Sequence, residues 1–209
     1  MKRVGWALVA LGLVDIAYMA YCIMHAQNYS SSLNIFAVIA GAFLINGHLG
    51  AARIVTWWSA FLFTGFTGGI LACLVLMKPF DLWLAEFHLR PGSTLFGVLA
   101  SAAATALLFW TYRELRSTEV LQARAAAGQT IAPPKLAFAA GALIVVGFVP
   151  LLFYMMHGET AAKALKLAEA KEGPGFKYNI TSLSSEGEHG TASVTAYNAS
   201  EIKSVDVNW

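Results

Sequence analysis

Five long apolar runs fill most of the first 156 residues, and they restrict the possible folds of the chain more than any other feature. They cover residues 4–24, 33–49, 54–77, 94–112 and 136–156. A helix needs about 20 apolar residues to cross a bilayer, and every run except the shorter second one is close to that length. Charged residues make up only 12% of the chain, against about 25% in soluble domains. The sequence therefore predicts a mainly α-helical membrane protein, with about five transmembrane helices in a domain of residues 1–156.

Lysine and arginine are unevenly distributed around these runs. With the N-terminus in the cytoplasm, the cytoplasmic side holds Lys2, Arg3, Arg53, Arg113, Arg116, Arg124 and Lys135. The short loops of the opposite side hold only Lys78 and Arg90. Cytoplasmic loops carry an excess of basic residues, so the pattern predicts a multi-pass protein of the bacterial inner membrane with a cytoplasmic N-terminus. An odd number of spans then places the C-terminus in the periplasm.

A short amphipathic helix is predicted over residues 79–90, between the third and fourth runs. One face of this helix carries Phe80, Trp83, Leu84 and Phe87, which have the i, i+3, i+4, i+7 spacing. Pro79 suits the first turn of a helix, and a Pro-Gly pair follows the segment. We expect this helix to lie on the outer surface of the membrane, with its apolar face toward the lipid.

The composition changes after residue 156, where the long apolar runs stop. Residues 159–172 have a helical pattern. Apolar and polar residues then alternate near 176–180, 192–196 and 205–209, with the period of β-strands. The sequence predicts a small periplasmic α+β domain over residues 157–209, made of one helix and a three-stranded antiparallel meander.

Asp15 lies in the middle of the first apolar run. An acidic side chain at that depth is costly, and it must meet protein, water or a partner, or stay protonated. In the predicted topology four hydroxyl residues reach a similar depth in the third and fourth runs, namely Thr64, Thr67, Ser101 and Thr105. Their hydroxyls could hydrogen-bond a neutral Asp15. A contact with a basic residue of a partner subunit and a role in moving protons or ions are the two alternatives.

Small residues recur at a spacing of four within the apolar runs. Gly65 and Gly69 form such a pair in the third run, and Ala37 and Gly41 form one in the second. This spacing lets helix backbones approach closely. We therefore predict tight helix packing at these residues, either within the chain or against a partner.

Three histidines fall near the predicted outer face, and they are His25, His88 and His157. Imidazole nitrogens together with nearby carboxylates could bind zinc or copper. The spacing is not that of a known metal motif, so the pattern leaves any cofactor open. No histidine is placed in the middle of a span, which argues against a b-type haem held by two imidazoles.

The chain contains no sequence motif of the common nucleophilic, phosphate-binding or zinc-dependent enzymes. The net charge of +2 is too small to indicate nucleic acid as a partner. We therefore predict a non-enzymatic accessory or assembly subunit of a larger bacterial inner-membrane complex, with the lipid bilayer and other membrane-protein subunits as partners. One alternative is a small oligomeric transporter or channel-like protein that uses Asp15. A second is a membrane metal-binding protein or enzyme with an outer-face histidine cluster.

Overall fold

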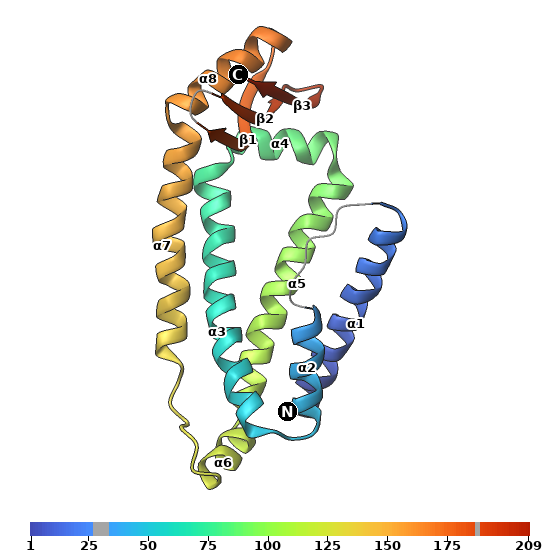
Figure 1. The fold of residues 1–209 in the computed structure, drawn as a ribbon, viewed down its shortest axis with the longest axis vertical. Coiled ribbons are helices and arrows are strands. Elements are labelled where there is room, and N and C mark those ends of the chain that lie inside the picture. Colours follow the sequence, from blue (N-terminus) through green and yellow to red (C-terminus); the bar gives the residue numbers. More distant parts are fainter. Residues whose placement is uncertain (27–33, 187–188) are drawn as a thin grey trace. The chain divides into compact units, whose positions relative to one another are not determined.

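A computed structural model describes residues 1–26, 34–186 and 189–209 of the chain (Figure 1). The helices are α1 (Lys2–Met24), α2 (Asn34–Ile45), α3 (Leu49–Ala72), the π-helical turn η1 (Cys73–Met77), α4 (Phe80–Leu89), α5 (Pro91–Leu115), α6 (Thr118–Ala126), α7 (Lys135–His157) and α8 (Glu159–Glu172). The strands are β1 (Lys177–Glu186), β2 (His189–Tyr197) and β3 (Ile202–Asn208). Within the described residues, four helices, α1, α3, α5 and α7, are long and apolar enough to cross a membrane. The predicted mainly helical fold is confirmed, and these four helices fit the predicted membrane protein.

The second apolar run forms a shorter helix than expected. Its helix α2 has 12 residues, which corresponds to a length of about 18 Å. The hydrocarbon core of a bilayer is about 30 Å thick, so α2 alone does not make a full span. Residue 33, where we expected this span to begin, lies outside the described residues.

The chain divides into two compact units. The first comprises Met1–Thr64 and Ala106–Gly141, and the second comprises Gly65–Thr105 and Ala142–Trp209. The division falls within α3, α5 and α7, so each of these helices contributes residues to both units.

The first unit is built around a close pairing of α1 with α2 (Figure 1). A Cβ atom built on Gly5 would lie 2.7 Å from the carbonyl oxygen of Gly41, and one built on Gly41 would lie 2.6 Å from the carbonyl oxygen of Gly5. The backbones of the two helices therefore touch at these glycines. Close by, the first unit has a cluster of fully buried side chains made of Val4, Leu44, Ala52 and Leu115. This cluster brings together the start of α1, the end of α2, the start of α3 and the end of α5.

The second unit contains an antiparallel sheet with the strand order β1-β2-β3, as predicted for the C-terminal segment. Ile180 pairs with Val194, which in turn pairs with Val205, and all three side chains are buried. Helix α8 packs on this face of the sheet (Figure 1), and its buried residues Ala161, Ala164 and Ala168 allow a close approach. The alternation between apolar and hydroxyl residues along β2 explains why a single face is covered.

Helix α4 has nearly the bounds predicted from the sequence, and it packs against the sheet within the second unit. Asp81 forms an ion pair with Lys177 at the start of β1. The Arg90 guanidinium donates a hydrogen bond of 3.3 Å to the carbonyl oxygen of Ile202, at the start of β3. Because Lys177 and Ile202 both pair with Tyr197, α4 crosses one end of the sheet.

Candidate functional site

Asp15 is half-buried in α1 of the first unit. Two of the four hydroxyls expected to reach it make other hydrogen bonds. Thr64 donates to the carbonyl oxygen of Ala60 at 3.0 Å, and Thr105 donates to that of Ser101 at 2.9 Å. Such bonds to the preceding turn of the same helix are common for hydroxyl residues in helices.

Thr67 differs from these two hydroxyl residues, because its Oγ1 atom is buried without a hydrogen-bond partner among the described residues. Thr67, Ser101 and Thr105 belong to the second unit, whereas Asp15 and Thr64 belong to the first. The contact between Asp15 and these hydroxyls therefore stays a prediction.

The glycines of the apolar runs fall into two groups. Gly41 lies against Gly5 of α1, as described above, and Ala37 is half-buried one turn earlier on α2. A Cβ atom built on Gly65 or Gly69 would meet no other atom within 4 Å among the described residues. These two glycines therefore mediate no close helix contact among the described residues of the second unit, and a contact with a partner stays a prediction.

Gly5 was not anticipated as a packing residue, because it has no small residue four positions away. Gly12, two turns further along α1, is also buried. A spacing of seven places the two glycines on one side of the helix. A search for this longer spacing would have found the α1 contact surface.

Each of the three outer-face histidines forms a hydrogen bond with its own helix. The Nδ1 atom of His25 lies 2.9 Å from the Tyr21 carbonyl oxygen, that of His88 lies 2.8 Å from Leu84, and that of His157 lies 2.9 Å from Phe153. In the described part of the chain, no group of three His, Cys, Asp or Glu side chains is placed to hold a metal ion. The metal-binding alternative gains no support from this geometry.

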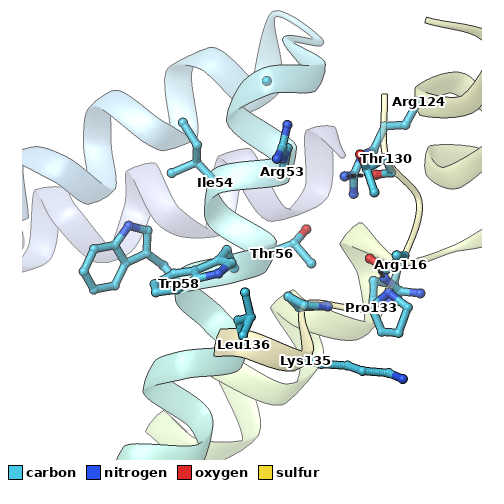
Figure 2. Close-up of a pocket in the computed structure, with 14 residues that line it drawn as sticks. Arg53, Ile54, Thr56, Trp58, Arg116, Arg124, Thr130, Pro133, Lys135 and Leu136 are labelled. Carbon is cyan, nitrogen blue, oxygen red and sulfur yellow. Dashed lines mark hydrogen bonds between the residues drawn. The ribbon is translucent and has the colours of Figure 1, made fainter. Parts of the chain in front are cut away.

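A large pocket in the first unit was not anticipated from the sequence, and we call it the basic pocket. It has a volume of about 940 Å³ and is lined by the start of α3, the segment from Arg116 to α6, and the loop that leads into α7. Four of its lining residues are cationic, namely Arg53, Arg116, Arg124 and Lys135. Figure 2 shows Arg116, Arg124 and Thr130 on one side of the pocket, across from Ile54 and Trp58.

Two arginines of the basic pocket hold the loop between α6 and α7. Arg124 donates from Nη2 to the carbonyl oxygen of Thr130 at 2.6 Å. Arg116 donates from Nη1 to the carbonyl oxygens of Ile131 and Ala132 at 3.4 and 3.3 Å. Backbone carbonyls are the acceptors in all of these bonds, so the contacts place the loop but leave the positive charges without a counter-ion.

Arg124 is the most unusual residue of the basic pocket, because its side chain is buried at 3% exposure. Burial lowers the pKa of its guanidinium, and the positive charges of Arg116 and Arg53 lower that pKa further. An arginine still keeps its proton at neutral pH, because its ordinary pKa is far above 7. Among the described residues, none of the four cations of the pocket forms an ion pair with a carboxylate.

Comparison of the chain with protein-family models, with curated proteins and with solved structures gives no match.

Proposed function

We propose that the chain is a non-enzymatic accessory or assembly subunit of a larger complex in a bacterial inner membrane. Its membrane helices would dock beside other subunits, and its C-terminal sheet domain would contact the part of the complex outside the membrane. The N-terminus would lie in the cytoplasm and the C-terminus in the periplasm.

The main support is the contrast between two pairs of glycines in the apolar helices. Gly5 and Gly41 show that, in this chain, a helix partner approaches until the backbones touch. Gly65 and Gly69 present the same kind of surface on α3, with open space beside them in the described chain. Association of helices in lipid depends on close packing at small residues. An unused pair of this kind is what a subunit would present to a neighbouring helix.

The docking of the sheet on α4 also supports this proposal. Phe80, Leu84 and Phe87 of α4 are exposed at 76, 47 and 45%, as expected of a helix whose apolar side lies in the membrane surface. The ion pair of Asp81 with Lys177 then ties the sheet to the same surface. The sheet face opposite α8 carries hydroxyl pairs, Thr181 with Thr195 and Ser193 with Ser204. We propose this polar face as the part of the domain that meets a partner outside the membrane.

Native mass measurement tests the proposal. The protein would be extracted in mild detergent from its own membranes, and we expect an assembly that contains this 22.4 kDa chain and at least one different chain. The double change Gly65→Leu and Gly69→Leu fills the open space on α3, and we expect it to reduce recovery of the partner about tenfold. Val146→Leu is the matched control, because Val146 is apolar, lies in α7 and is 71% exposed.

Two results would contradict the proposed function. Recovery of the chain as a lone monomer would show that it has no stable partner. An assembly made only of copies of this chain would favour the small oligomeric transporter instead, and transport assays on Asp15→Asn would then follow.

A further inference from the structure

We propose that the basic pocket binds the phosphate group of an anionic phospholipid, with the acyl chains of that lipid lying along the apolar side of the pocket. This inference goes beyond the accessory role and does not depend on it.

The first argument is the charge of the pocket. Arg53, Arg116, Arg124 and Lys135 line it together. The two acidic residues nearest in sequence, Glu114 and Glu119, are not among its lining residues. A buried charge is costly unless an opposite charge accompanies it, and Arg124 is only 3% exposed. A bound anion would supply the missing charge.

The second argument is the set of free donors. A guanidinium has five N–H donors in a planar fork. Arg124 uses an Nη2 donor for the Thr130 carbonyl, but its Nε is buried without a hydrogen-bond partner among the described residues. A buried donor without an acceptor is destabilising. Phosphate oxygens match the arginine fork in geometry and carry the required charge.

The third argument concerns the helix ends around the pocket. Gly50, in the first turn of α3, and Lys135, the first residue of α7, both line it. The N-terminus of a helix carries a partial positive charge. Two such ends add to the attraction that the four cationic side chains already exert on an anion.

The apolar side of the pocket favours a lipid over a soluble phosphate compound. Ile54, Trp58 and Leu136 line the pocket, yet they are 59, 50 and 79% exposed. These residues belong to α3 and α7, two of the helices able to cross a membrane. Tryptophan is enriched where helices leave the lipid, and basic pockets between membrane helices fit anionic headgroups. The volume of about 940 Å³ is far more than one phosphate ion needs.

The test uses the full chain, purified in neutral detergent and freed of native lipid. Phosphatidylglycerol and phosphatidylcholine with the same acyl chains are added in turn, and the thermal midpoint and the retained lipid mass are measured. We expect phosphatidylglycerol to raise the midpoint saturably and to be retained, and phosphatidylcholine to do neither. Arg124→Met should weaken phosphatidylglycerol binding about tenfold, because it removes a charge-assisted hydrogen bond.

Arg113→Met is the matched control. Arg113 is an exposed cation of α5 that does not line the pocket, so this variant should bind phosphatidylglycerol like the original protein. If Arg124→Met does not fold, Arg116→Met takes its place, because Arg116 also lines the pocket and is less buried.

Other outcomes overturn the proposal. Equal responses to the two lipids, or equal retention by the pocket variants and the Arg113 control, would mean that only general surface charge is sensed. An equal midpoint shift with inorganic phosphate alone would assign the pocket to a soluble phosphate compound. A native complex in which an acidic partner segment crosslinks to the pocket would assign it to a protein.

Discussion

Gly5 and Gly41 illustrate how strongly single residues decide helix packing in this chain. Each glycine places its backbone against the carbonyl of the other, where a methyl group would approach to 2.7 or 2.6 Å. Cα–H groups at such contacts point toward carbonyl oxygens and add weak stabilisation. Arg124 is the opposite case, because a large charged residue is buried at 3% exposure. The two glycines are explained by the helix backbone opposite them, and Arg124 donates a hydrogen bond to the loop between α6 and α7.

The glycine contact leads to a prediction for Gly41→Ala. The added methyl group cannot fit without moving α1 away from α2, and we expect the free energy of unfolding in detergent to fall by about 1–3 kcal/mol. Gly65→Ala is the control, because its methyl group enters open space and alanine favours helix by about 1 kcal/mol over glycine. Chemical denaturation followed by circular dichroism measures both changes. Equal loss in the two variants would show that Gly41 packs no more closely than Gly65.

At the scale of elements, α4 has apolar residues on more than one side. The sequence pattern placed Trp83 on one apolar side together with Phe80, Leu84 and Phe87. The structure leaves Phe80, Leu84 and Phe87 exposed, whereas Trp83 is half-buried. Leu82 was not part of that pattern, yet its side chain is 2% exposed. Lys78, just before the helix, forms an ion pair with Glu86 and lies 4.3 Å from the centre of the Trp83 ring. The helix thus offers one side to its surroundings and packs the other within the second unit.

Leu82 and Leu84 provide a matched pair for testing this arrangement. Leu82→Ala should lower the free energy of unfolding by about 2–5 kcal/mol, because it leaves a cavity at a buried position. Leu84→Ala should change it by less than about 1 kcal/mol in detergent, since Leu84 is 47% exposed. Hydrogen exchange of the backbone amides at the start of β1 and β3 would measure whether this end of the sheet separates from α4. Similar effects of the two changes would contradict the burial of Leu82 between α4 and its surroundings.

At the scale of the whole molecule, the first unit brings together the ends of several long apolar helices. The start of α1, the end of α2, the start of α3 and the end of α5 meet in one cluster. The start of α7 lies at the basic pocket, together with the start of α3. An odd number of passages through the membrane would account for this arrangement, although α2 is too short to be a full span by itself. We therefore propose that α2 belongs to a fifth crossing.

Reporter fusions test this number of crossings. We expect a phosphatase fused after Trp209 to be active, because that enzyme folds only in the periplasm, and a fluorescent protein inserted at Gly128 to be bright in the cytoplasm. If the fluorescent protein at Gly128 is dark and the phosphatase after Trp209 is inactive, both positions lie on the sides opposite to those expected, so the chain crosses an even number of times and α2 completes no crossing. The orientation of the basic pocket and of the sheet domain would then have to be revised together.

The sequence by itself determined the class of the protein and most of its elements. Apolar runs, the alternation in β2 and the bounds of α4 are local patterns, and each depends on residues within one or two helical turns or strand pairs. The side of the membrane expected for each cation also came from counting the lysines and arginines in each loop. Local patterns therefore carried the prediction up to the level of single elements.

Only the tertiary structure decided which elements meet. In the tertiary structure Gly5 packs against Gly41, whereas Gly65 and Gly69 have open space beside them. Arg53, Arg116 and Arg124 line one pocket. The distribution of basic residues in the sequence predicts only that these three arginines lie on the cytoplasmic side. A close contact or a shared pocket depends on the residue that another element brings opposite, and that information is absent from the spacing within any one segment.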